Sequence, residues 1–168
     1  MNCKDVNRQL FKFIEASPSA FHAVYEMKRR LLDAGYEQLL ESRAWKLKPG
    51  GKYFVTRNGS SILAFRIPEN LKHVAMTTMA AGKKVQEEQK PFGFQIMASH
   101  SDSPSFKIKE HPEMGVEEHY IKLNVEKYGG MLLAPWFDRP LSVAGRIIVK
   151  NEDWLESRLV SVDRDLCM

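Results

Sequence analysis

The sequence predicts a mixed α/β protein that begins with helices and ends with short strands. Apolar residues recur at helical spacing in the first 34 residues, and an Asn-Gly pair at 58–59 separates two strand-like segments. After residue 104, four short strand-like segments follow one another with no good helical pattern among them. Because this change of pattern falls near 103–106, we expect two domains, 1–104 and 105–168.

Two amphipathic helices are predicted at the start of the chain. The first has apolar residues at i, i+4, i+7 and i+8, so they share one face. These residues are Val6, Leu10, Phe13 and Ile14. A break at 17–19 separates it from a second helix over about 19–34. The stripe of the second helix consists of Phe21, Val24, Tyr25, Leu31 and Leu32, with Lys28 as its polar member. Gly35 stands where a helix commonly ends with a left-handed residue.

A β-hairpin is predicted after the helices. Its strands are 53–57 and 61–67, and the Asn-Gly pair between them favours the positive φ angles of a tight turn. The next segment, 73–79, is apolar and β-branched enough for another strand or a short buried segment. Residues 82–90 form a charged stretch, which we expect to be an exposed loop.

Residues 92–98 are the strongest candidate for a central strand. They are apolar on both faces, as expected when both sides of a sheet are covered. The strand candidates of the second half are 106–109, 120–125, 141–150 and 158–162.

The composition limits the class of protein. The chain has 168 residues, 43% hydrophobic content, a net charge of +4 and a pI near 9.0. This length allows one sizeable core, and the mild positive charge permits acidic partners without requiring nucleic acid. The two cysteines, Cys3 and Cys167, fit a reducing compartment, and a disulfide between them stays open. With no secretory leader and no apolar run near about 20 residues, we expect a cytoplasmic protein with no membrane partner.

The segment that carries chemistry is 98–104, where the predicted central strand ends. His100 and Asp102 are two residues apart there. A ring nitrogen of His100 can ligate zinc, and Asp102 can accept a hydrogen bond from the other ring nitrogen, which fixes the tautomer. Functional side chains gather at the carboxyl ends of strands in open α/β sheets. The alternative is a polar histidine at the end of a strand, and the pattern alone favours that alternative.

The other candidate residues are weaker. We expect His22 to lie on the surface or at the cap of the second helix, and His73 starts an apolar run. His111 and His119 lie in charged stretches that we interpret as solvated loops. The run 136–139 is typical of a turn closed by an Asp–Arg ion pair. The sequence contains no serine nucleophile elbow and no phosphate-binding glycine loop.

Three blocks of the chain together resemble a known family. Residues 98–104 resemble the His-Thr-Asp-Ser-Pro metal-binding signature of the aspartyl aminopeptidase family. Residues 128–131 and 136–147 resemble its block Tyr-Gly-Gly … Trp-Phe-Asp-Arg-Asp-Leu … Ala-Gly-Arg. Residues 13–24 resemble its segment Phe-Leu … Ser-Pro-Ser-Pro-Phe-His. The blocks occur in the family's order and cover nearly the whole chain.

The resemblance implies a zinc metallo-aminopeptidase of the cytosol or vacuole with two zinc ions in the complete enzyme. It implies that His100 ligates one zinc and that Asp102 is the catalytic acidic residue that orients it. Residues 1–104 would be the N-terminal part of an α/β catalytic domain, and 105–168 an incomplete β-rich lid and dimerisation domain. Peptides with an acidic N-terminal residue would be the substrates. The enzyme would be a homo-oligomer built from dimers, up to a dodecamer.

The chain departs from the family pattern. Ser101 replaces a threonine, and Pro140 replaces an acidic residue. The bridging carboxylate, the general-base glutamate and the other ligands have no counterpart in the sequence. Since a catalytic zinc needs about three protein ligands, we expect the 168-residue chain alone to be inactive and to bind zinc weakly.

Two other classes of function remain open. One is a non-catalytic dimerisation or interaction module derived from the same family, formed by the strand-rich second half. The other is a basic nucleic-acid binder, which only the pI suggests. The sequence lacks an aromatic and basic platform for bases, so we expect no nucleic-acid partner.

Overall fold

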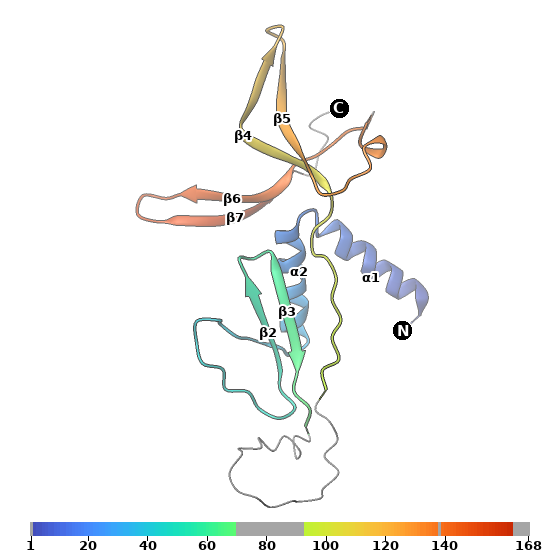
Figure 1. Cartoon of the computed structure of the whole chain (residues 1–168), viewed down its shortest axis with the longest axis vertical. Coiled ribbons are helices and arrows are strands. Elements are labelled where there is room, and N and C mark those ends of the chain that lie inside the picture. Colours follow the sequence, from blue (N-terminus) through green and yellow to red (C-terminus); the bar gives the residue numbers. More distant parts are fainter. Residues whose placement is uncertain (1, 70–92, 138, 163–168) are drawn as a thin grey trace, which may run out of the picture. The chain divides into compact units, whose positions relative to one another are not determined.

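The computed structural model describes residues 2–69, 93–137 and 139–162. It contains both helices and sheets, which confirms the predicted mixed α/β class (Figure 1). The elements are, in chain order, α1 Cys3–Glu15, α2 Ala20–Asp33, β1 Glu37–Gln38, β2 Lys52–Arg57, β3 Ser61–Arg66, β4 Ser105–Val116, β5 Tyr120–Tyr128, the 3-10 helix η1 Ala134–Trp136, β6 Ala144–Lys150 and β7 Leu155–Ser161. The chain forms two compact units. The first comprises Met1–Glu26 and His100–Met168, and the second comprises Met27–Ser99.

Both predicted helices are confirmed, and local capping explains where they begin and end. The side chain of Asn2 accepts a hydrogen bond of 3.3 Å from the backbone N–H of Lys4 and caps α1. The hydroxyl of Ser19 lies 2.8 Å from His22 Nδ1 and accepts from the His22 backbone N–H at 3.5 Å, so Ser19 caps α2 and His22 lies at this cap, as predicted. Gly35 follows α2 with a φ of 78°, in the expected left-handed region. None of the described helices is long and apolar enough to span a membrane.

The buried face of α2 differs from the predicted stripe. Its buried residues are Ala23, Val24 and Glu26, whereas Tyr25 and Leu32 are 63% and 48% exposed. Apolar spacing therefore identified the helix but not the side on which it packs.

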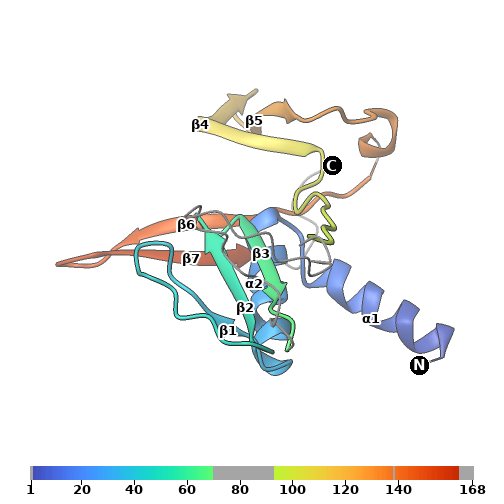
Figure 2. The ribbon, with the colours of Figure 1, turned by 60° about the horizontal axis from the view of Figure 1, so that its bottom comes forward.

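The second unit contains a three-stranded sheet with the order β1-β2-β3. β2 and β3 form the predicted hairpin, with Arg57 paired to Ser61 beside the turn. In the turn, Asn58 and Gly59 have φ angles of 53° and 67°, as expected for an Asn-Gly pair. β1 runs parallel to β2 and was not predicted, because two residues are too few to show a period. Phe54 of β2 is fully buried, and the second half of α2 lies beside this sheet (Figures 1 and 2).

The prediction of a central strand at 92–98 is wrong for the residues that the structure describes. Residues 93–98 belong to no strand. The exposed fractions of Phe94, Ile96 and Met97 are 79%, 81% and 93%. A strand forms only where a neighbour exchanges backbone hydrogen bonds with it, and no described strand pairs with this segment. The predicted elements at 73–79 and 82–90, and with them His73, lie outside the described residues.

The first unit contains two antiparallel ribbons, β4–β5 and β6–β7 (Figure 1). They confirm the four strands expected after residue 104. β4 runs longer than predicted, through the charged stretch around His111 that we expected to be a loop. A bulge between Ile108 and Glu113 accommodates this stretch, with His111 at a φ of 50°. Glu117 and Glu118 form the turn to β5, with φ angles of 52° and 60°.

Two aromatic contacts join the ribbons to other parts of the first unit. Phe106 of β4 meets Trp136 of η1 edge to face, with 5.4 Å between the ring centroids. The guanidinium of Arg146 in β6 lies 4.1 Å from the ring centroid of Phe21 in α2. The Asp–Arg pair predicted within 136–139 involves a residue outside the described part of the chain, so it stays a prediction.

Two further expectations stay predictions. Cys3 is exposed, but Cys167 lies outside the described residues, so a disulfide between them stays open. The division of the chain into the domains 1–104 and 105–168 also stays a prediction.

Candidate metal centre

His100 and Asp102 lie in the segment of the first unit that leads into β4. Pro104 follows, and Ser105 begins the strand, so the pair stands just before a strand. The sequence had placed it after one. The side chain of His100 is 92% exposed and that of Asp102 is 32% exposed. The imidazole is therefore open to solvent, whereas the carboxylate is partly covered.

A hydrogen bond joins the two predicted site residues. Nδ1 of His100 lies 2.9 Å from Oδ1 of Asp102. An ionised carboxylate can only accept a hydrogen bond, so Nδ1 carries a proton, and in the neutral form of the ring Nε2 then keeps its lone pair. A neutral imidazole with a free Nε2, held by a carboxylate at Nδ1, is the usual form of a histidine that ligates zinc.

Tyr128 is a third member of this cluster, and sequence reasoning assigned it no role. Its hydroxyl donates to Oδ2 of Asp102 at 2.5 Å. Tyr128 ends β5 and pairs with Ser105 at the start of β4, so the ribbon brings the hydroxyl next to Asp102. The signal in the sequence was the Tyr-Gly-Gly block at 128–130, which matched the family but did not reveal its contact.

The hydrogen bonds of the cluster shift the pKa values of its members. The Tyr128 hydroxyl, and to a smaller extent His100, lowers the pKa of Asp102 below its usual range, because both donate to the charged carboxylate. In return, the negative charge of Asp102 raises the pKa of Tyr128. Asp102 is therefore an anion, and Tyr128 a neutral donor, at neutral pH.

The described residues fit one ligand of a zinc site. Within residues 2–69, 93–137 and 139–162, no group of three or more His, Cys, Asp or Glu side chains is placed to hold a metal. His22 contacts Ser19 at the start of α2, and His111 and His119 lie at the bulge and the turn of the β4–β5 ribbon. His100 thus offers one nitrogen ligand, and Asp102 is engaged in orienting it.

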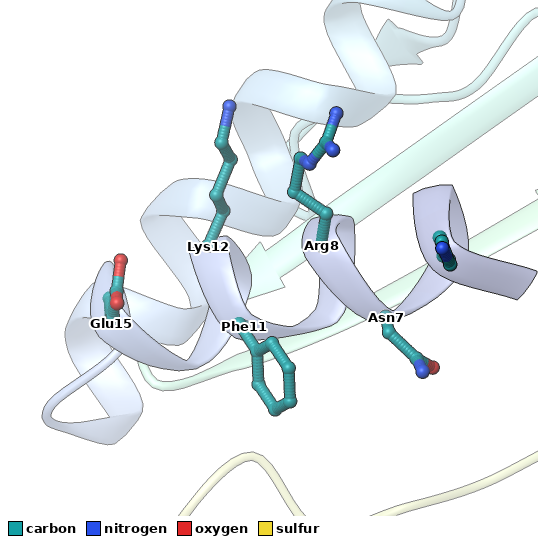
Figure 3. Close-up of a pocket in the computed structure, with 6 residues that line it drawn as sticks. Asn7, Arg8, Phe11, Lys12 and Glu15 are labelled. Atoms are coloured by element: carbon teal, nitrogen blue, oxygen red, sulfur yellow. The ribbon is translucent and has the colours of Figure 1, made fainter.

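A shallow hollow lies on α1 (Figure 3). It is lined by Lys4, Asn7, Arg8, Phe11, Lys12 and Glu15. Arg8 and Lys12 point to one side of the helix, whereas Asn7 and Phe11 point to another (Figure 3). Since one exposed helix supplies all of these side chains, we read the hollow as helix surface.

Solved aminopeptidase structures share this fold over nearly the whole chain. A chain in the cryo-EM structure of the Ape4 and Nbr1 complex gives 37% identity and a TM-score of 0.78, covering 92% of this chain and 27% of that one. The structure of mApe1 from Chaetomium thermophilum gives 36% identity and a TM-score of 0.77, covering 94% and 33%. The fold is therefore that of part of an aminopeptidase.

The family is equally clear from the sequence. The family described as "Aminopeptidase I zinc metalloprotease (M18)" matches residues 13–168, and the chain belongs to it. A "Probable M18 family aminopeptidase 2" from Clostridium acetobutylicum is 41% identical over 161 residues, which are 95% of this chain and 33% of the relative. The chain therefore spans about a third of the length of the curated relatives it matches. These findings confirm the resemblance seen in the three sequence blocks.

Proposed function

We propose that this chain is part of a zinc-dependent aminopeptidase, a hydrolase that removes N-terminal residues from peptides. The observation that carries the proposal is the 2.9 Å contact between His100 Nδ1 and Asp102 Oδ1, inside the block that resembles the family's metal-binding signature. Membership of a zinc metalloprotease family supports the reaction class. The exposed imidazole, with its Nδ1 directed at Asp102, supports His100 as the residue that contacts the metal.

In this proposal each residue of the pair has a separate task. His100 presents Nε2 as one zinc ligand, while its Nδ1–H donates to Asp102. Asp102 fixes the tautomer and direction of the ring and increases its strength as a ligand. When bound, zinc acidifies a water molecule and stabilises the oxyanion that forms during peptide hydrolysis. Two zinc ions serve the complete enzyme, and their other ligands and the general-base glutamate come from sequence beyond this chain.

The 168-residue chain alone is inactive in this proposal. A catalytic zinc requires about three protein ligands and an open position. The described residues supply one suitable ligand, and no three-residue cluster completes it. The chain by itself would therefore bind zinc weakly and hydrolyse no peptides.

We further propose acidic N-terminal residues as the preferred substrates and the cytoplasm as the location. The net charge of +4 supports contact with acidic peptides, since opposite charge steers association.

Residues 105–168 belong, in this proposal, to a β-rich lid and dimerisation domain, and 1–104 to the catalytic domain. Isolated two-stranded ribbons are at best marginally stable, so β4–β5 and β6–β7 need a partner. Their exposed apolar side chains include Tyr120, Ile121, Trp154 and Leu155. A homo-oligomer built from dimers would cover such side chains. The solved dodecamer of S. cerevisiae mApe1, which shares this fold with a TM-score of 0.75, supports an assembly of that size.

A second candidate function is a non-catalytic dimerisation module derived from this family. It is favoured by the same exposed ribbons and by the single zinc ligand among the described residues. Light scattering and zinc analysis separate the two. A stable dimer that contains no zinc favours the module, whereas a zinc-containing assembly favours the enzyme.

The experiment that tests the proposed function measures release of N-terminal residues by the natural protein that contains this chain. Peptides differing only in the first residue, Asp, Glu, Ala or Leu, are compared with and without a zinc chelator. We expect fastest release of Asp or Glu, loss of release with chelator, and recovery with added zinc. Release that persists in excess chelator would contradict the proposal. Release by the 168-residue chain alone would contradict its predicted inactivity.

A further inference from the structure

We propose that Tyr128 is a positioning residue of the zinc site, which holds Asp102 in the orientation that directs His100 toward the metal. The inference rests on the proposed function, because it concerns the same site. It adds a residue from the end of β5 to the pair in the segment before β4.

Both carboxylate oxygens of Asp102 accept hydrogen bonds. One carboxylate oxygen accepts from His100 Nδ1 at 2.9 Å, and the other accepts from the Tyr128 hydroxyl at 2.5 Å. With a donor on each oxygen, rotation of the carboxylate about its bond to Cβ would break at least one of the bonds. Tyr128 therefore fixes the plane of the group that His100 contacts.

The ring of His100 is held by its hydrogen bond and not by packing. Its side chain is 92% exposed, so packing does not hold the ring. Among the described residues, Asp102 is the hydrogen-bond partner of this ring. The direction of Nε2 consequently depends on Asp102, and through Asp102 on Tyr128.

The backbone around Tyr128 lies close to the segment that holds Asp102. Tyr128 pairs with Ser105, three positions after Asp102, so the ladder places the end of β5 beside the segment that holds Asp102. Gly129 then leaves the strand with a φ of 75°, which a residue with a Cβ rarely adopts. A Cβ on Gly129 would also lie 3.4 Å from Cγ of Pro104, so the backbone after Tyr128 passes close to the site segment. The main-chain path of β5 and Gly129 therefore places the Tyr128 hydroxyl near Asp102.

The hydrogen bond from Tyr128 to Asp102 is one that a single substitution can remove. A hydroxyl that donates to a charged carboxylate forms a stronger hydrogen bond than a neutral pair does. Tyr128→Phe removes this donor and keeps the ring, so β5 keeps its packing. The carboxylate is then free to turn, and the Nδ1-protonated form of His100 loses part of its stabilisation.

The test compares Tyr128→Phe with Tyr120→Phe in the natural protein. Tyr120 begins the same strand and pairs with Val116 at the other end of the ribbon, so it is a matched control. Solid-state 15N NMR of histidine-labelled, zinc-free protein reports which ring nitrogen of His100 is protonated, with His100→Ala assigning the signal. Competition with a chelator reports the affinity for zinc itself. Circular dichroism confirms that each variant is folded.

We expect Tyr128→Phe to reduce the Nδ1-protonated fraction of His100 and to weaken zinc binding by up to about tenfold, the lower end of the effects of outer hydrogen-bond partners. Tyr120→Phe should match the wild type in both readouts. The inference is overturned if Tyr128→Phe leaves either readout unchanged, because a purely structural role would not shift the tautomer and zinc affinity together.

The zinc content of His100→Ala and the release of N-terminal residues distinguish this failure from failure of the proposed function. If His100→Ala loses zinc while Tyr128→Phe behaves as wild type, the positioning role is wrong and the proposed function stands. If His100→Ala keeps all its zinc, His100 is not a ligand and the role of Tyr128 is overturned with it, while the chelator-sensitive release of N-terminal residues decides separately whether the proposed function stands.

Discussion

Tyr128 lies 26 residues beyond Asp102 in the chain, yet its hydroxyl is 2.5 Å from Oδ2 of that carboxylate. The contact links the end of β5 to the segment before β4 in which His100 lies. A residue of the ribbon therefore contributes to the geometry of the candidate metal centre. The ribbon and the site segment both belong to the first compact unit.

Replacing the orienting carboxylate should weaken zinc binding. In Asp102→Asn the side chain keeps its size but loses its charge, so it holds the Nδ1-protonated form of His100 less firmly. We expect the natural protein to lose roughly 10- to 100-fold in zinc affinity, the usual effect of such outer partners. Chelator competition measures it. Asp5→Asn, in the first turn of α1, is the control and should bind zinc as the wild type does. Equal affinity in Asp102→Asn and wild type would show that Asp102 does not orient a zinc ligand.

An ion pair in the second unit should respond to pH. Arg57 Nη2 lies 2.6 Å from Glu41 Oε1, and hydrogen bonds from this guanidinium lower the pKa of Glu41. Because the folded pKa is depressed, the pair contributes to stability above the unfolded pKa of Glu41. That contribution is lost as the pH falls through the lowered folded value.

The check is a 13C titration of the Glu41 carboxyl. In Arg57→Gln its pKa should rise toward the ordinary value for glutamate. The same pKa in both proteins would show that the contact does not persist in solution.

The end of α2 should depend on glycine. The backbone N–H groups of Gly35 and Tyr36 each donate at 2.9 Å, to the carbonyls of Leu32 and Leu31, in a capping motif that needs the φ of 78°. A Cβ at Gly35 would meet nothing within 4 Å, so Gly35→Ala costs only backbone strain. We expect a loss of about 1 kcal/mol in the free energy of unfolding of the natural protein.

Gly145→Ala is the matched control for that substitution. Its Cβ would also meet nothing within 4 Å, and its φ lies outside the left-handed region. Urea unfolding should therefore show little change or a slight gain in stability for this variant. If both alanine variants unfold at the same urea concentration, the left-handed end of α2 is not under strain.

The segment before His100 should make the isolated 168-residue chain self-associate. Phe94, Ile96 and Met97 are all highly exposed, and contiguous apolar surface of this kind drives association. Replacing the three with serine should lower the average mass seen by light scattering. Replacing Ile62 and Leu63 of β3 with serine tests whether any loss of apolar side chains has the same effect. A monomeric wild-type chain at high concentration would contradict this prediction.

Local signals in the sequence predicted local structure well. Gly35 at the end of a helix and the Asn-Gly pair in a hairpin were correct, because both depend on the φ preferences of single residues. Contacts between distant residues were not predicted. The pairing that brings Tyr128 to Asp102 depends on the register of β4 and β5, and composition does not reveal a register. The strand expected at 92–98 was wrong for a related reason, since an apolar run becomes a strand only when a partner pairs with it.

The measurement that most directly tests the account is the zinc content of His100→Ala, determined by elemental analysis of the purified natural protein. His111→Ala is the matched control, because that exposed histidine lies at the bulge of β4. The account predicts that His100→Ala loses the zinc bound through its imidazole, while His111→Ala keeps the wild-type content. Wild-type zinc in His100→Ala would contradict the assignment of His100 as a ligand.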